Sequence, residues 1–329
     1  MKIAIVILNW NGKALLEQFL PSVISFSKDA DIYVADNAST DDSVAFLKTH
    51  FPQIKIIQNS TNGGYAKGYN DALKHVKADV FCLLNSDVEV TKNWLLPIQE
   101  TFINEPNTAI IQPKILDQKN KDYFEYAGAA GGFIDKLGYP YCRGRIFNTI
   151  EKDEGQYNDI IDVFWASGAC LFVRNNVYKS LGGLDESFFA HMEEIDFCWQ
   201  TKNLGFDVKY VGNSTIYHVG GATLSNTNPK KTYLNFRNSL YTLVKNASGN
   251  TFYLVFVRLV LDGIAGLKFL LELKPKHTLA IIKAHFSFYS HLTTLLKQRK
   301  NQNKLSKYYS QKSIVWSYFI TKKRYFKSL

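Results

Sequence analysis

The chain has 329 residues, and its balance of 46% hydrophobic and 21% charged residues excludes a disordered protein. Its formal net charge of +10 comes from the C-terminal quarter, because residues 245–329 hold 16 Lys and Arg against two acidic residues, a net of +14. The rest of the chain has a net charge of −4. This asymmetry predicts an anionic partner for the C-terminal part, either nucleic acid or a membrane surface.

Four cysteines are far apart and form neither a CxxC pair nor a zinc spacing: Cys82, Cys142, Cys170 and Cys198. Free thiols in apolar surroundings behave as small hydrophobes, so a reducing cytoplasm fits them best. The first residues, MKIAIVILNWNG, contain one Lys and an apolar run that stops at Asn9. That run is too short for a secretory signal, and we expect it to form a first buried strand.

Short apolar runs alternate with amphipathic segments along the first part of the chain. The predicted strands are 2–8, 32–35, 54–57, 80–84 and 109–112. Four helices are expected between them. The first spans 14–26, the second follows Ser39 or Thr40 as its cap, the third runs to about Val76, and the fourth spans 93–102. This alternation predicts a parallel, doubly wound sheet with right-handed crossovers.

Three of the predicted strands end in polar clusters, at 9–11, 36–41 and 85–87. The carboxyl ends of parallel strands lie along one edge of the sheet, where open α/β folds bind their ligands. Asn85 and Asp87 are separated by one residue, so their oxygens can converge on a hard cation such as Mg²⁺ or Mn²⁺. A plain turn of Asn, Ser and Asp is the alternative interpretation.

The glycine-rich loop follows the third strand rather than the first. NWNG stands where a nicotinamide enzyme has GxGxxG, and the loop at 62–68 lacks the GK[ST] of a P-loop, so neither class is supported. Gly63, Gly64 and Gly68 allow close approach of a phosphate or sugar at a helix N-terminus. An ordinary turn into a helix is the alternative.

After an irregular insertion expected at 117–159 and an apolar run at 163–173, a helix begins near His191. Its carboxylates Glu193, Glu194 and Asp196 either compensate the helix dipole or supply a general base. Beyond a strand at 207–211, His218 ends a further apolar run just before two glycines. As an isolated histidine, His218 has either a structural role or a role as a metal ligand.

Seven segments carry a resemblance to a known family. They are VILNWNG (6–12), VADNASTDDS (34–43), NGGYAKGYN (62–70), LLNSDV (83–88), ASGACLFVR (166–174), GGLDESFFAHMEEIDFCWQ (182–200) and YHVGG (217–221). In this order they resemble the family 2 glycosyltransferases, which are inverting enzymes, and particularly their rhamnosyltransferase-like branch. The resemblance implies a GT-A-type fold, that is, a doubly wound, mainly parallel, Rossmann-like α/β sheet, in a catalytic domain of residues 1–244.

The resemblance also implies roles for single residues. Asp36 would bind the nucleotide base, with Asn9 and Trp10 nearby, and Asp87 would hold Mg²⁺ or Mn²⁺ at the donor diphosphate with a further contact from His218. The remaining residues implied for nucleotide-sugar binding are Asn62, Gly64, Asn70, Asn85, Ser86 and Arg237. The implied donor is a dTDP-, UDP- or GDP-linked sugar.

Two positions depart from the family pattern. Asn85 replaces the first Asp of the DxD-like motif, so one charged metal ligand is missing. The usual Glu-Asp pair is Glu193 and Glu194, which implies Glu194 as the catalytic base, with Asp196 as the alternative. The implied reaction is inverting transfer to a lipid-linked or growing cell-surface polysaccharide. A non-catalytic nucleotide-sugar-binding subunit and a nucleotidyltransferase are the alternatives, although NWNG speaks against the latter.

The C-terminal region, 245–329, is expected to form basic amphipathic helices. Arg258, Asp262 and Lys268 interrupt its first apolar stretch and argue against a transmembrane span, and Arg258 and Asp262 are spaced to pair. A second helix is expected at 279–296. Apolar faces with many Lys predict binding to the anionic inner face of the cell membrane, with a helical cap on the catalytic domain as the alternative. Nucleic acid is not expected, because no binding motif accompanies the charge.

Overall fold

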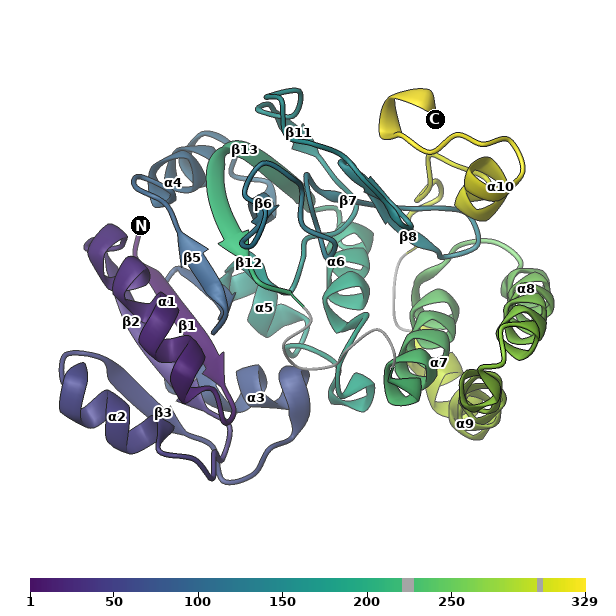
Figure 1. Ribbon diagram of the computed structural model, residues 1–329. Helices are drawn as coiled ribbons and strands as arrows, with labels where there is room; N and C mark the ends of the chain where they lie inside the picture. The colour runs from purple at the N-terminus through teal and green to yellow at the C-terminus, as the bar shows by residue number, and fades with distance from the viewer. Residues whose placement is uncertain (221–227, 301–303) are drawn as a thin grey trace.

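The computed structural model describes residues 1–220, 228–300 and 304–329. Gly221 of the YHVGG segment and residues 301–303 of the basic C-terminal region therefore lie outside the described residues. Within them, the main sheet has nine strands (Figure 1). In spatial order these are β11 (Ile160–Asp162), β13 (Asp207–His218), β6 (Thr108–Asp117), β12 (Cys170–Arg174), β4 (Val80–Asn85), β1 (Ile3–Asn9), β2 (Ala30–Asp36) and β3 (Lys55–Gln58), with β5 (Val88–Val90) paired to β13.

The sheet has a hydrophobic core on each face. Ile3, Ile5 and Ile7 of β1 pack into one core, and the alternate residues Ala4 and Val6 pack into the other. The first core includes residues of α1 (Lys13–Phe26), α2 (Ser43–His50) and α4 (Leu95–Asn104), and the second includes residues of α3 (Gly64–Leu73), α5 (Asn175–Ser180) and α6 (Glu193–Asn203). Burial on both faces explains the continuous apolar runs, and the doubly wound α/β prediction is confirmed.

The predicted clustering of strand ends at one edge is also confirmed. β1 pairs in parallel with β2 and with β4, so that Asn9 lies opposite Asp36 and Leu8 opposite Asn85. The four cysteines are free and buried, as small apolar side chains are.

Several local predictions were wrong. The insertion at 117–159 contains a small sheet, formed by β7 (Gly132–Ile134), β8 (Pro140–Cys142), β9 (Arg145–Ile146) and β10 (Thr149–Ile150). The strand predicted at 207–211 continues to His218, and β12 runs antiparallel to both of its neighbours, β4 and β6. Neither Ser39 nor Thr40 caps α2, because the Ser39 hydroxyl and the Thr40 backbone amide bond to Asn11 in the loop after β1, and the helix starts only at Ser43.

The C-terminal part of the chain is helical and lies at the end of the molecule away from β3 (Figure 1). It comprises α7 (Pro229–Asn246), α8 (Thr251–Leu271), α9 (Pro275–Lys300) and α10 (Ile314–Phe319), and the 3-10 turns are η1 (Glu186–Phe188) and η2 (Phe326–Ser328). α7 packs between α6 and α9 and is continuous through the predicted domain boundary at 244/245, and that division stays a prediction. None of the helices in the described part of the chain combines the length and apolar character needed to cross a membrane.

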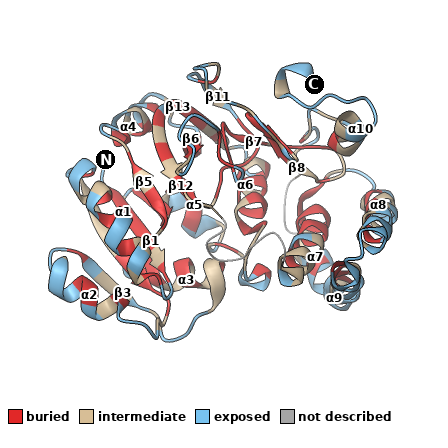
Figure 2. Ribbon diagram, viewed as in Figure 1, coloured by how far each residue is buried: buried red, intermediate tan, exposed pale blue. Residues whose placement is uncertain are grey.

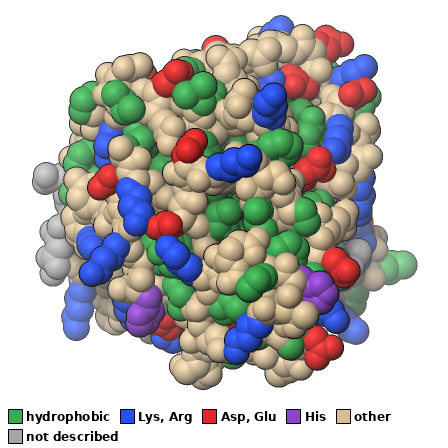
Figure 3. Space-filling view, turned by 90° about the vertical axis from the view of Figure 1, so that its left-hand side faces the viewer, with side chains coloured by type: hydrophobic (Ala, Val, Ile, Leu, Met, Phe, Trp, Pro, Cys, Tyr) green, Lys and Arg blue, Asp and Glu red, His purple; other side chains and the backbone are tan. Residues whose placement is uncertain are grey.

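The two ends of the molecule differ in surface character. α7 is largely buried, whereas the outer sides of α8 and α9 are exposed (Figure 2). At the opposite end, which faces the viewer in Figure 3, basic, acidic and apolar side chains are interspersed.

Candidate active site

The loops after β1 and β2 are joined by side-chain hydrogen bonds. Asn9 Nδ2 donates to Asp36 Oδ1 and to Ser39 Oγ, both at 3.2 Å, and the Ser39 amide donates to Asp36 Oδ2 at 3.1 Å. Asn9 and Asp36 are buried, whereas Trp10 is 51% exposed. Satisfied buried polar networks rigidify a loop. Two of the predicted base-binding residues are thus held together, and the third is open to solvent.

The glycine-rich loop before α3 is bonded to the same edge. Asn37 Nδ2 donates to Asn62 Oδ1 at 2.9 Å and to Gly64 O at 3.2 Å. Gly64 has φ of +83°, and a Cβ there would lie 2.4 Å from Phe189 O. Both facts require glycine at this position. The loop therefore brings Gly64 against the segment that precedes α6.

Asn70 has its polar atoms engaged by the protein. Its Nδ2 donates to Leu184 O at 2.8 Å and to Glu186 Oε1 at 3.0 Å, and its Oδ1 accepts from Tyr178 OH at 2.6 Å and Leu184 N at 2.9 Å. These four bonds fill the hydrogen-bonding capacity of an amide side chain. Asn70 thereby ties α3 to the chain before α6, and its contact with a nucleotide sugar stays a prediction.

Asp87 and His218 meet because β5 pairs with the end of β13, where His218 lies opposite Val88. His218 Nε2 lies 3.1 Å from Asp87 Oδ1, and His218 Nδ1 lies 3.5 Å from Glu125 Oε1; all three side chains are buried. Burial disfavours the imidazolium ion, but the two carboxylates outweigh it and raise the pKa of His218 to about 10. The cluster thus attracts positive charge.

These groups fit a divalent cation in part. Carboxylate oxygens are the donors that Mg²⁺ and Mn²⁺ prefer, whereas imidazole nitrogen is more typical of Zn²⁺ and Fe²⁺ sites. Asn85 turns Nδ2, not its oxygen, toward His218 Nε2, at 3.4 Å. No group of three or more His, Cys, Asp or Glu among residues 1–220, 228–300 and 304–329 forms a metal site. Substrate phosphates commonly complete such sites. Ser86 faces the loop after β1, with Oγ 3.6 Å from the Cβ position of Gly12.

The segment before α6 has a strained backbone. Phe189, His191 and Met192 have φ of +64°, +69° and +75°. This left-handed conformation costs a non-glycine residue about 1–2 kcal/mol. Such strain persists only where the surroundings impose it, and it concentrates at functional sites.

Asn238 of α7 holds this segment in place. Its Nδ2 donates to Phe188 O at 3.1 Å, Ala190 O at 2.9 Å and His191 O at 2.7 Å, and the residue is fully buried. Arg237 also bonds the segment, with Nη2 3.0 Å from Phe188 O. The described contacts of Arg237 are therefore with the protein, and its predicted contact with the donor phosphates stays a prediction.

Glu193 and Glu194 begin α6 directly after the strained segment. The Oε2 atom of each is buried, and within the described residues neither atom has a hydrogen-bond partner. Burial raises the pKa of Glu193 well above its ordinary value, and the Glu194 carboxylate adds to this. Burial also raises the pKa of Glu194, to about 7, although backbone N–H groups at the helix start oppose it. Glu194 is thus poised to exchange a proton near neutral pH.

Asp196, the alternative base, is fully bonded by the protein. Its Oδ2 lies 2.6 Å from Lys245 Nζ and accepts from Gln200 Nε2 at 2.7 Å, and its Oδ1 accepts from Asn246 Nδ2 at 2.6 Å. Asp196 has no exposed surface. Burial raises the pKa of Asp196, and the ion pair with Lys245 opposes that rise. Because both oxygens are already bonded by the protein, neither is free to accept a proton from an acceptor hydroxyl. Its contacts give Asp196 a structural role.

Tyr65 connects the carboxylates of α6 to the end of β4. Burial raises the pKa of Tyr65 well above its usual range, and the nearby charges of Glu193 and Glu194 contribute. Tyr65 OH donates to Gly168 O at 2.7 Å, and the next residue, Ala169, accepts at its carbonyl from the Asn85 amide at 3.0 Å. The predicted base and the predicted metal-binding turn therefore belong to one contiguous site.

Three residues of this site were not predicted from the sequence: Glu125, Asn238 and Lys245. Glu125 lies in a stretch without periodicity, so no pattern singled it out. Asn238 follows Arg237 in the sequence FRN (236–238), and only the charged Arg237 was predicted to bind the donor. Lys245 was counted only as part of the basic C-terminal region.

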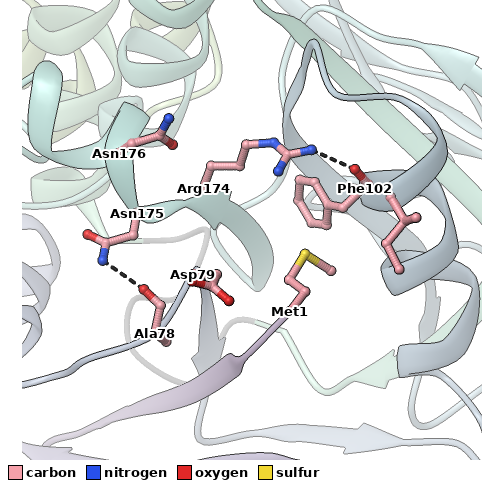
Figure 4. A pocket seen from close by; sticks show the side chains of 8 residues that line it. Met1, Ala78, Asp79, Phe102, Arg174, Asn175 and Asn176 are labelled. Carbon is pink, nitrogen blue, oxygen red and sulfur yellow. Dashed lines mark hydrogen bonds between the residues drawn. The ribbon is translucent and has the colours of Figure 1, made fainter.

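A hollow of about 510 Å³ lies elsewhere, at the amino ends of β1 and β4 (Figure 4). Arg174 and Asn175 line it, but Arg174 Nη2 donates to Phe102 O at 2.6 Å and Asn175 Nδ2 to Ala78 O at 2.7 Å. Both side chains are thus committed to backbone carbonyl groups. This hollow is separate from the edge that carries the carboxylates.

Comparisons with known proteins identify a family. The family model described as glycosyl transferase family 2 matches residues 4–181. N-acetylglucosaminyl-diphospho-decaprenol L-rhamnosyltransferase of Mycobacterium tuberculosis is 25% identical over 219 residues, which cover 62% of this chain and 71% of that protein.

Two solved structures are similar in fold. GalNAc-T7 with UDP, GalNAc and Mn²⁺ has a TM-score of 0.60 and 17% identity, and the match covers 74% of this chain but only 48% of that one. The mannosyltransferase PcManGT of Pyrobaculum calidifontis, with GDP-Man and Mn²⁺, has a TM-score of 0.53 and 11% identity over 91% of this chain and 84% of that one. The GT-A-type fold prediction is confirmed by these likenesses.

Proposed function

This chain belongs to glycosyl transferase family 2, and from that premise we propose that it transfers a sugar from a nucleotide-sugar donor, with inversion, to a lipid-linked or growing cell-surface polysaccharide. The similarity to a rhamnosyltransferase named for a decaprenol-linked substrate supports a lipid-linked acceptor. The likenesses to structures holding UDP or GDP-Man support a nucleotide-sugar donor. We propose a UDP-, dTDP- or GDP-linked sugar. We propose that the reaction takes place in the cytoplasm, at the inner face of the membrane.

The observation that carries this proposal is the carboxylate pair at the start of α6. Glu194 has a pKa of about 7, a buried oxygen without a partner, and a strained segment in front of it. Inverting transfer needs a base that takes the proton of the acceptor hydroxyl while the acceptor oxygen bonds to the anomeric carbon. The bond to the diphosphate oxygen breaks on the opposite side, and the nucleoside diphosphate leaves. Glu194 is our proposed base, and burial favours the protonated form of Glu193.

At the other end of the site, Asp87 and His218 would hold Mg²⁺ or Mn²⁺. The cation would supply Lewis-acid stabilisation of the charge on the leaving diphosphate. Asn9, Trp10 and Asp36 would bind the base of the nucleotide, along the edge formed by β1 and β2. We propose that Asn62, Gly64, Asn85 and Ser86 also bind the nucleotide sugar. Asn70 and Arg237 would hold the surrounding loops in position.

A direct test offers the purified protein a panel of nucleotide sugars with Mn²⁺ or Mg²⁺ and lipid-linked acceptors. We expect one donor to raise the melting temperature and to be consumed only with an acceptor present, because ligands that bind the native state stabilise it. Failure of every donor to bind would overturn the proposal. Binding without turnover in the presence of all acceptors would favour a non-catalytic subunit.

The rate of transfer should depend on pH through Glu194. The base must be ionised, and with a pKa of about 7 only about a tenth of it is ionised at pH 6. We therefore expect kcat/KM to rise with pH and to level off above pH 8, with a roughly tenfold deficit at pH 6. A pH series of initial rates measures this, with donor binding at each pH as the control. A flat profile between pH 6 and pH 8 would contradict the assignment.

Asp87→Asn should remove the metal dependence of donor binding. The variant loses the charged oxygen that lies 3.1 Å from His218 Nε2. We expect transfer to fall about a hundredfold or more and the stabilisation by Mn²⁺ with UDP to disappear. Asp122→Asn, at a side chain that is 73% exposed, is the matched control. If the Asp87 variant keeps a normal Mn²⁺-dependent melting shift, the metal assignment fails.

A further inference from the structure

α8 is amphipathic in the reverse of the usual sense. Its charged residues Arg258 and Asp262 point inward and are buried, with Arg258 Nε 3.5 Å from Asp262 Oδ1. Arg258 also donates to Leu137 O at 2.9 Å and to Ser239 Oγ at 2.7 Å, which fixes α8 to the body of the protein. A surface helix normally turns its charges to water and its apolar side chains to the core. Here the inward face carries an ion pair beside the apolar Leu254.

The outward face of α8 is apolar over its whole length. Its exposed large side chains recur every three or four residues: Phe252, Phe256, Val260, Ile264, Leu267 and Leu271. Phe252 is 84% exposed and Phe256 57%. At 1.5 Å per residue this stripe is about 28 Å long. Lys268 is the single exposed charged residue between Thr251 and Leu271.

Neighbouring segments extend this surface. Leu273, in the turn after α8, is 88% exposed, and α10 contributes Trp316 and Phe319, with Lys268 Nζ 5.8 Å from the Phe319 ring. α9, which packs against α8, adds further exposed side chains: Leu279, Ile282, Phe286 and Tyr289. We call the outward side chains of α8, α9 and α10 and of the turn after α8 the apolar face. Figure 2 shows the outer sides of α8 and α9 exposed.

The rim of the apolar face is basic. Its exposed cations are Lys268, Lys274, Lys276, Lys283, Lys322, Lys323 and Arg324. Among the described residues from 245 onward, Glu272 is the single exposed acidic side chain, and it pairs with Lys274 at 2.8 Å. The mixed surface at the opposite end of the molecule has no such bias (Figure 3).

This charge distribution selects the occupant of the face. Large exposed apolar patches mark interaction sites. A symmetric dimer through the same face would bring two basic rims together, which repel. An anionic bilayer instead attracts the cations at its headgroups and accepts apolar and aromatic side chains just below them. No described helix is suited to span the bilayer, so the helices would lie along its surface.

We propose that the apolar face docks the protein onto a bilayer of acidic phospholipids, with α8 lying flat in the interface. Trp316 and Tyr289 would lie at headgroup depth, and the Lys side chains would meet lipid phosphates. Docking needs neither donor nor acceptor, so it can fail while the transfer reaction stands, and the reverse also holds.

The test is flotation of the full chain with phosphatidylcholine vesicles that contain or lack about 30% phosphatidylglycerol. We expect the protein to bind the acidic vesicles, with an affinity that falls as salt is added. Without the acidic lipid, the affinity should be about tenfold lower or more. The triple variant Phe256→Ser, Ile264→Ser and Leu267→Ser should lose about tenfold or more in affinity, since each side chain loses its transfer into an apolar environment.

A matched control is the double variant Leu96→Ser and Ile103→Ser of α4, whose side chains are 52% and 64% exposed at another surface. It should bind like the wild type. Undiminished binding by the triple variant would overturn the proposal. So would a wild-type protein that forms a dimer, loses that dimer in the triple variant and does not bind the vesicles. If the triple variant folds poorly, a second measurement uses the wild-type protein. Brominated lipids should quench its tryptophan fluorescence, and this quenching should be lost in Trp316→Phe. No quenching would also refute docking.

Discussion

Replacing Glu194 with Gln is expected to reduce sugar transfer about a thousandfold or more while leaving donor affinity unchanged. Gln has the shape of Glu but cannot accept the proton of the acceptor hydroxyl. Glu194 lies at the start of α6 with one buried, unpartnered oxygen, so the substitution should disturb the fold little. The measurement is kcat with saturating acceptor, together with the affinity for the donor from calorimetry.

Two companion variants separate the three carboxylates of α6. Glu193→Gln should retain much of the activity, because the pKa of Glu193 is raised well above its ordinary value, which favours the neutral form that Gln resembles. Asp196→Asn should lower stability more than it alters the chemical step, since Asp196 is bonded to Lys245 and Asn246. Full activity in Glu194→Gln, with loss in either companion, would reassign the base.

Lys245→Met should be the most destabilising single substitution tested, with the free energy of unfolding lowered by about 3–5 kcal/mol. Lys245 Nζ lies 2.6 Å from both Asp185 Oδ2 and Asp196 Oδ2, and its side chain is almost fully buried. Met keeps the length of the side chain but leaves the buried Asp196 carboxylate and the partly buried Asp185 carboxylate without the Lys245 cation between them. Urea unfolding measures the loss.

The deficit should also depend on pH in a known direction. Without its cation, buried Asp196 is held neutral, so its folded-state pKa lies above the unfolded value of about 4. Such a group favours the folded state at low pH and loses that contribution as the pH rises. The difference between variant and wild type should therefore shrink toward pH 5. Adding Asp196→Asn to the variant should restore part of the stability.

Lys268→Met is the matched control for this experiment, because the Lys268 side chain is 66% exposed. Its effect should stay within about 0.5 kcal/mol. Equal stability of the two Met variants would show that the pair with Asp196 contributes nothing. A large effect of Lys245→Met would make α7 part of the support for the catalytic helix.

Most of the edge that carries the candidate site could be predicted from the sequence because its signals are local. Apolar runs that end in Asn9, Asp36 and Asn85 predict parallel strands, and parallel strands put their ends on one edge. Met192, Ile195 and Trp199 recur at the i, i+3 and i+7 spacing that predicts a core-facing helical stripe, and all three are buried. The pairing of Arg258 with Asp262 followed from their i, i+4 spacing.

The sequence by itself thus determined the α/β class, the edge that carries the candidate site and the charge of the C-terminal region. The tertiary structure alone decided which polar groups are already bonded: Asp196 meets Lys245, 49 residues away, and Asn238 holds the strained backbone at His191. It also decided that α8 turns its ion pair inward and its apolar face outward. Periodicity gives the faces of a helix, but only packing between distant segments decides which face is buried.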